Sequence, residues 1–294
     1  MSIFIGSGAA VCTPFDANGA FNPSAYEKLI QFQVEKGTDA IVSCGTTGEA
    51  STLSKDEHIE VVRQAVAAAK GKVPVVAGAG GNDTAKCIEM GKALAKAGAT
   101  ALMYTTPYYN KTSQKGLVAH FSALAAALDV PIVLYNIPGR TGMNMTAKTM
   151  AELAKLPNIC AVKEASGDFG QVAEIAERCG DALDIYSGND DYILPILSLG
   201  GKGVISTIAN IAPTQVHDMV RLFHEGDVAA SRKIQLGMLP VVRCLFADVN
   251  PIVTKAALNL MGFGMGECRL PLVAPEDNVL ADLKKAMAAY GLPV

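Results

Sequence analysis

The sequence has no tryptophan, and aromatic residues occupy only 6% of its 294 positions. Charged residues are also sparse, at 18%, and the formal net charge is −3. Nucleic-acid binding needs a basic surface to meet phosphates, so this composition argues against a nucleic-acid partner. No apolar run approaches the roughly 18 residues that cross a bilayer, so we expect no membrane partner either. The opening MSIFIGSGAA lacks the basic segment of a signal peptide, and we expect a cytoplasmic protein.

The cysteines and histidines give no sign of a disulfide framework or a metal site. The seven cysteines are odd in number and form no CxxC pair, so we expect small buried thiols in a reducing compartment. The histidines, His58, His120, His217 and His224, lack the spacing of metal ligands, and we expect no metal. His217 and His224 could share one helix face, but a solvated face is the simpler explanation.

Short apolar segments alternate with amphipathic ones over about the first 225 residues. The apolar segments are rich in Val, Ile or Ala, which is typical of parallel strands covered on both faces. The amphipathic segments begin near Ser, Thr or Asp and end near Gly, as helices do. Eight evenly spaced units predict an α/β fold, a (β/α)8 TIM barrel, with a doubly wound open sheet as the alternative. The expected strands are 8–12, 39–44, 73–78, 99–104, 131–136, 159–163, 183–188 and 202–206.

The alternation stops near Asp227. Beyond it, the segments 228–246, 250–262 and 275–291 each have a helical pattern, and no strand-like run separates them. We therefore predict a barrel over residues 1–226, with its active site at the C-terminal strand ends, and a small three-helix C-terminal extension over residues 227–294.

Polar and aromatic residues collect at the predicted C-terminal ends of the strands, where a barrel of this kind carries its catalytic groups. They come from the ends of six separate strands, so the prediction that they meet at one end of the molecule depends on the predicted barrel. They are Thr46, Thr47 and Glu49 after the second strand, Tyr108 and Tyr109 after the fourth, Tyr135 and Arg140 at and after the fifth, Lys163 at the sixth, Gly188 after the seventh, and Ile205 and Ser206 at the eighth.

Lys163 stands at the end of the apolar segment ICAVK, although lysine is seldom buried without a partner or a function. Burial lowers the pKa of a lysine, and the neutral amine can attack a ketone to form a Schiff base. A phenol such as Tyr135 could move protons, and an arginine fork such as Arg140 suits a carboxylate. Each residue alone could be an ordinary rim, turn or surface residue. Their shared position favours imine chemistry.

Two glycine-rich segments could suggest a phosphate site. GAGGND (78–83) and GGKGVIS (200–206) both lack the GxxxxGK[ST] and GxGxxG patterns. A tight turn and a helix stop explain them better, and we predict no nucleotide cofactor.

A series of motifs runs through nearly the whole chain: AVCTPF, GTTGE, TPYYN, YNIPGRTG, VKEASGD, YSGND, GVIS and RLPL (269–272). In this order they make the chain similar to the dihydrodipicolinate synthase and N-acetylneuraminate lyase superfamily of class I aldolases. The resemblance implies that Lys163 forms a Schiff base with pyruvate and that no separate cofactor is needed. It also implies that Tyr135 is the proton shuttle.

The same resemblance implies roles for further residues and for a partner subunit. Thr46 would link Tyr135 to Tyr109 in a hydroxyl relay, and the backbone of Thr46 and Thr47 would bind the pyruvate carboxylate. Gly188 and Ile205 would make backbone contacts near the lysine. Tyr109 would reach into a neighbouring subunit, which implies a homo-oligomer, either a dimer or a tetramer built as a dimer of dimers.

Arg140 separates the activities within this superfamily. The resemblance implies that it binds the carboxylate of L-aspartate 4-semialdehyde, and that the product of condensation with pyruvate is 4-hydroxy-tetrahydrodipicolinate, on the diaminopimelate route to lysine. Two alternatives stay open: an aldolase acting on a sugar acid such as N-acetylneuraminate, and a catalytically silent barrel that binds a keto acid.

Some members of the superfamily are inhibited by lysine at a pocket on the dimer interface. His58, Asn82 and Tyr108 match that pocket, whereas Lys55 and Lys86 depart from it. Because two ammonium groups would repel a cationic amino acid, we predict weak or no inhibition by lysine.

Overall fold

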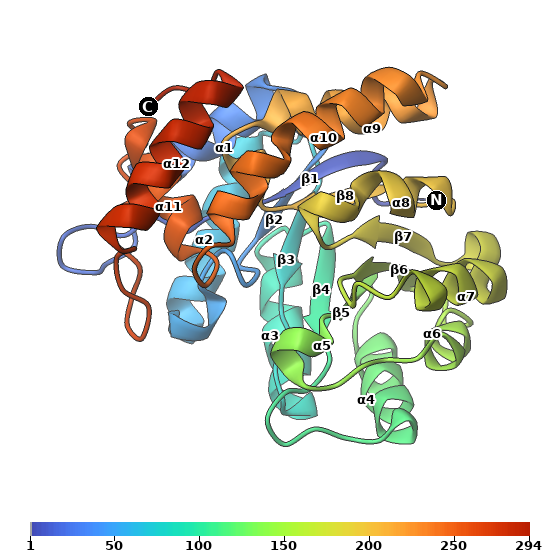
Figure 1. The fold of residues 1–294 in the computed structure, drawn as a ribbon. Helices are drawn as coiled ribbons and strands as arrows, with labels where there is room; N and C mark the ends of the chain where they lie inside the picture. Colours follow the sequence, from blue (N-terminus) through green and yellow to red (C-terminus); the bar gives the residue numbers. More distant parts are fainter. Residues whose placement is uncertain (1) are drawn as a thin grey trace.

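The structure, a computed structural model, describes residues 2–294. Its strands are parallel and form a closed barrel in which β1 pairs with β8 (Figure 1). The predicted (β/α)8 barrel is confirmed, and the open sheet is excluded. Predicted and observed strand ends differ by up to two residues. Within the described residues the strands are β1 Gly6–Ala10, β2 Ala40–Ser43, β3 Val75–Gly78, β4 Ala101–Thr105, β5 Ile132–Asn136, β6 Ile159–Glu164, β7 Asp184–Ser187 and β8 Gly203–Ser206.

Helices follow the strands and form the outer layer (Figure 1). Side-chain caps fix where several of them begin: the Ser54 hydroxyl accepts from Glu57 N, and Asp168 accepts from Gln171 N. None of the helices within residues 2–294 combines the length and hydropathy needed to cross a membrane. The α-helices of the barrel are α1 Pro23–Glu35, α2 Lys55–Ala69, α3 Thr84–Lys96, α4 Gln114–Ala127, α5 Pro138–Thr141, α6 Ala147–Leu153, α7 Phe169–Cys179, α8 Ile193–Ser198 and α9 Pro213–His224, and the short 3-10 helices are η1 Ala50–Thr52, η2 Gly180–Ala182, η3 Asp190–Tyr192 and η4 Ile208–Asn210.

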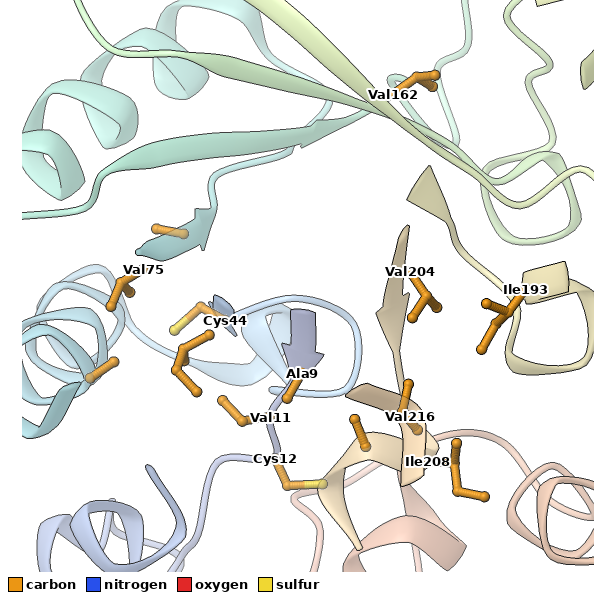
Figure 2. Close-up of a cluster of buried hydrophobic side chains, with 14 of the residues drawn as sticks. Ala9, Val11, Cys12, Cys44, Val75, Val162, Ile193, Val204, Ile208 and Val216 are labelled. Atoms are coloured by element: carbon orange, nitrogen blue, oxygen red, sulfur yellow. The ribbon is translucent and has the colours of Figure 1, made fainter. Parts of the chain in front are cut away.

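Successive strand residues point alternately outward and inward, and this alternation creates two separate apolar layers. The outer layer lies between strands and helices, and Figure 2 shows part of it, including Val204 of β8 and Ile193 of α8. The inner layer fills the barrel itself and includes Val42, Tyr135 and Tyr186. Because the interior is packed with side chains, reactive groups have room only at one end of the barrel.

Three further helices pack against the barrel: α10 Val228–Leu245, α11 Ile252–Leu260 and α12 Asp277–Tyr290 (Figure 1). They correspond to the three predicted helical segments. α10 contacts both α9 and α12, so the extension is packed against the barrel and is not separated from it by a linker. The division of the chain at residue 227 into two parts stays a prediction.

A buried ion pair ties this extension to the loop after β2. Glu49 adopts a left-handed conformation, with φ at 53°, and its Oε1 accepts a hydrogen bond from Lys255 Nζ of α11 at 2.7 Å. Its other oxygen accepts from the main-chain N–H of Arg269 at 2.9 Å. Lys255 is 1% exposed, and its ammonium also donates to the main-chain oxygen of Glu267 at 2.9 Å. The carboxylate of Glu49, which the sequence placed among the strand-end candidates, is thus used to hold the extension.

Replacing Lys255 with Met should destabilise the protein strongly. Met fills similar volume, but it leaves the Glu49 carboxylate buried without its cation. Removing one partner of a buried pair costs about 3–5 kcal/mol, so urea denaturation should give a free energy of unfolding lower by that amount. The control is Lys285→Met, which removes an exposed cation that pairs with Asp282 on α12 and should change little. Equal, small effects for both variants would contradict the assigned role of Lys255.

Candidate active site

Lys163 lies on β6 with its side chain inside the barrel mouth, between two tyrosines of the neighbouring strands. It pairs in register with Tyr135 on β5 and Tyr186 on β7. Its ammonium nitrogen is 4.4 Å from the centroid of the Tyr135 ring, and the residue is only 6% exposed. Burial lowers the pKa of Lys163 to about 8, with Arg140 acting in the same direction and Asp190 opposing it. A useful fraction of the amine is therefore neutral near physiological pH.

The neighbours of Lys163 along β6 explain why this side chain points inward. Val162 belongs to the outer apolar layer. Glu164, on the other side, accepts hydrogen bonds from Ser166 N at 2.6 Å and from Asn136 Nδ2 at 2.9 Å. These bonds join the ends of β5 and β6, the strands that carry Tyr135 and Lys163. The sequence analysis did not single out Glu164 or Asn136, although both are polar residues that directly follow a candidate residue.

Tyr135 and Thr46 form the next part of the site. The Tyr135 phenol is buried, and both Tyr135 and Thr46 line the same cavity. Burial raises the pKa of Tyr135 to about 12, and Arg140 and Thr46 reduce the shift. Tyr109 is not brought into this group within one chain: it is 92% exposed, in a left-handed conformation with φ at 66°.

The turn after β2 presents two main-chain donors. Within residues 2–294, the N–H groups of Thr46 and Thr47 donate no backbone hydrogen bond. Gly48 allows the tight turn, because a Cβ there would stand 3.0 Å from the backbone of Cys44. The Thr47 hydroxyl accepts a hydrogen bond from Asn250 Nδ2 at 2.8 Å, which fixes its orientation. Two free N–H groups on one turn suit a carboxylate.

Arg140 follows β5 on the short helix α5, where its guanidinium donates to the main-chain oxygen of Asn250 at 3.4 Å. Asn250 therefore contacts both Thr47 and Arg140, a link that the sequence analysis missed because 203 residues separate Asn250 from Thr47. Gly188 lies directly against the lysine: a Cβ there would be 3.2 Å from Lys163 Cε. Ile205 is buried on β8 in the inner layer.

A cavity of about 600 Å³ opens beside these groups. Thr46, Tyr135 and Arg140 line it together with the residues that we expected in a regulatory pocket, apart from Lys55. Those lining residues are His58, Asn82, Lys86 and Tyr108.

Lys55 does not belong to this lining and forms an ion pair with Glu89 instead. Of the two lysines, Lys86 is thus the one that lines the cavity within this chain. His58 is buried, and its Nε2 is 2.8 Å from the main-chain oxygen of Gly78. Burial also lowers the pKa of His58, which favours the neutral imidazole.

Comparison with known proteins agrees with this arrangement along the whole chain. A model described as the dihydrodipicolinate synthetase family matches residues 3–290. The 4-hydroxy-tetrahydrodipicolinate synthase of Lachnoclostridium phytofermentans is 51% identical over 289 residues, which cover 97% of this chain and 98% of that protein. The enzyme of the same name from Caldicellulosiruptor bescii is 49% identical over 294 residues, covering 100% and 99%. The crystal structure of DHDPS from Cyanidioschyzon merolae with lysine bound superposes with a TM-score of 0.96 at 41% identity, over 99% of each chain.

Proposed function

The chain belongs to the dihydrodipicolinate synthetase family, and we propose that it condenses pyruvate with L-aspartate 4-semialdehyde to 4-hydroxy-tetrahydrodipicolinate in lysine biosynthesis. The observation that carries the chemistry is Lys163, a buried amine with a lowered pKa at the mouth of the barrel. Its free-base form is the nucleophile that imine formation needs. The seven cysteines are all free thiols, which fits the cytoplasm as the place where the enzyme works.

The first half of the reaction binds and activates pyruvate. The neutral amine of Lys163 attacks the keto carbon, and the resulting carbinolamine takes up one proton and loses one water to give a protonated imine. That imine draws electrons from the adjacent methyl group, which loses a proton and becomes a nucleophilic enamine. Tyr135, with Thr46 beside its phenol, is placed to carry protons in these steps. The free N–H groups of Thr46 and Thr47 would hold the pyruvate carboxylate.

The second half joins the two substrates. The enamine carbon attacks the aldehyde carbon of the semialdehyde, and its oxygen takes up a proton to become the 4-hydroxyl. The amino group of the semialdehyde then displaces Lys163 from the imine, which closes the ring and releases the lysine as an amine. Arg140 is the cation at the cavity mouth that would bind the semialdehyde carboxylate. Gly188 and Ile205 would shape the space beside the lysine, where a side chain at position 188 has no room.

The alternatives are less well supported. Both curated relatives described above carry the synthase name, which favours the synthase over cleavage of a sugar acid such as N-acetylneuraminate. A silent keto-acid-binding barrel would have no need of a buried amine whose pKa is lowered to about 8. Arg140 is the residue in this chain that favours a substrate with an additional carboxylate.

We also infer that the catalytic unit is a homodimer, either alone or paired into a tetramer. Tyr109 is 92% exposed within one chain, an unusual position for a large aromatic side chain, and it follows directly after Tyr108 at the cavity. Tyr109 also has a left-handed φ of 66°, which costs free energy at a bulky residue. Such a conformation tends to be kept where the position of the side chain has a function. Reaching across a two-fold axis, Tyr109 would extend the relay of Tyr135 and Thr46 in the partner.

Incubation with pyruvate and borohydride should add one reduced pyruvate to Lys163, detected by peptide mass spectrometry, and none to the Lys163→Ala variant. With the semialdehyde added, the wild-type protein should form the condensation product. Arg140→Ala should still be trapped by borohydride, because pyruvate does not need this guanidinium. Its kcat/KM for the semialdehyde should fall by about 10²-fold or more, since a charged hydrogen bond is lost.

Absence of a pyruvate adduct on Lys163 would contradict the imine mechanism. Cleavage of N-acetylneuraminate without condensation would identify the protein as the sugar-acid aldolase. Binding of pyruvate with neither reaction would favour the silent barrel.

Mixing two inactive variants tests whether Tyr109 acts in the partner subunit. Tyr109→Phe keeps the ring but removes the hydroxyl, and Lys163→Ala removes the nucleophile. If each site combines Lys163 from one chain with Tyr109 from the other, heterodimers regain one complete site. After subunit exchange at equal amounts, about a quarter of the wild-type activity should return. If co-purification of two differently tagged chains shows that mixed dimers form and activity still does not return, the crossing is contradicted.

L-lysine should inhibit the enzyme weakly or not at all, because the Lys86 ammonium lines the cavity and repels a cationic ligand. Lys86→Glu reverses this charge and should lower the inhibition constant. Lys92→Glu makes the same change at another exposed position of α3 and should have no effect. Sub-millimolar inhibition of the wild-type enzyme would refute the prediction.

A further inference from the structure

A buried carboxylate that no step above uses lies at the mouth of the barrel. Asp190 opens the 3-10 helix η3, after β7, and is only 2% exposed. Its Oδ2 accepts hydrogen bonds from the main-chain N–H groups of Thr207 at 3.1 Å and Ile208 at 2.8 Å, after β8. Its Oδ1 is buried and has no hydrogen-bond partner among residues 2–294. A buried carboxylate oxygen without a hydrogen-bond partner lowers the stability of the protein, so we expect a nearby positive charge to compensate for it.

The loop after β7 brings Asp190 to the lysine. Gly188, two residues before Asp190, packs against Lys163 Cε, and its N–H donates to the main-chain oxygen of Glu164 at 2.8 Å. From the outer side, Gln235 of α10 donates to the main-chain oxygen of Asp190 at 2.9 Å. Burial raises the pKa of Asp190, whereas its hydrogen bonds and the positive charge of Lys163 act to lower it. The Asp190 carboxylate in turn raises the pKa of Lys163, against the effect of burial. The loop is thus fixed between β6 and α10, and its Gly188 lies against the Lys163 side chain.

The charges around Lys163 leave Asp190 as the anion that can balance it. Arg140 of α5 is a cation and disfavours a second positive charge. The phenols of β5 and β7, Tyr135 and Tyr186, are buried, burial raises the pKa of both, and the Tyr186 hydroxyl donates to the main-chain oxygen of Phe4 at 2.6 Å. Glu164 is adjacent in sequence, but its carboxylate bonds to Ser166 and Asn136 on the other face of β6.

We propose that Asp190 is a positioning residue that acts through Lys163, its ionised carboxylate balancing the positive charge of the pyruvate imine. The inference rests on the proposed function, because it concerns the imine of that reaction. Only the protonated imine draws electrons well enough to release a methyl proton, and a cation in a buried site needs a nearby anion to persist. No proton passes to Asp190: it stays ionised while the imine forms, reacts and is released.

Asp190→Asn tests the charge with little change of shape. The amide oxygen can still accept from Thr207 and Ile208, while the neutral amide no longer favours a cation. Cyanoborohydride reduces the protonated imine in preference to the neutral one, so pyruvate trapping on Lys163, followed across pH by mass spectrometry, reports the protonated fraction. The alkaline limit of trapping should move to lower pH by about one unit or more in the variant. The kcat for condensation should fall at neutral pH and recover in part at lower pH.

Asp191→Asn, an exposed neighbour on the same 3-10 helix, is the matched control and should leave the pH profile unchanged. An Asp190→Asn variant that folds, forms the adduct and keeps the wild-type pH limit would overturn the proposal while leaving the proposed function intact. Absence of an adduct in the wild-type protein would instead overturn the proposed function.

A measurement on the wild-type enzyme decides the matter if the Asn variant does not fold. Asp190 is the one aspartate that is buried among residues 2–294. With ¹³C-labelled aspartate carboxyls, NMR of the pyruvate adduct at neutral pH should show every aspartate ionised. A protonated aspartate under these conditions would identify Asp190 as neutral and overturn the proposal.

Discussion

Keeping one amine out of water is the constraint around which the rest of this site is arranged. Lys163 loses its hydration inside the barrel mouth, and burial is the largest cause of its lowered pKa. Arg140 acts in the same direction, and Asp190 acts against it. The proposed mechanism needs both influences, because the lysine must be neutral to attack and its imine must be cationic to react. Burial favours the first state, and a nearby carboxylate limits the cost of the second.

The segments around the site are also held in place by contacts with the helical extension. Strands carry Lys163 and Tyr135, whereas three connecting segments around them are held from outside the barrel. Asn250 contacts Thr47 and Arg140, and Gln235 holds the main chain of Asp190. The helical extension therefore functions as a support for the catalytic end of the barrel. Preorganised donors and charges need no rearrangement during the reaction, which is the main advantage of such support.

Local patterns were enough to predict the barrel, its eight strands and the position of Lys163, because strand periodicity and strand ends are encoded within a few neighbouring residues. The residues that the sequence did not reveal act over long distances. Asn250 and Thr47 are 203 positions apart, and Lys55 meets Glu89 across two helices. The buried state of Asp190 depends on main-chain groups after β8, which no local pattern predicts.

The pair formed by Lys255 and Glu49 also bears on how the protein is made. Glu49 precedes its cation by 206 residues, so a ribosome finishes most of the barrel while this carboxylate still lacks its partner. The turn that carries Thr46 and Thr47 is closed by local backbone hydrogen bonds, but its contacts with Lys255 and Asn250 can form only after those residues have been synthesised. An incomplete chain would thus already have Lys163, while the turn after β2 still lacked its supports from the helical extension.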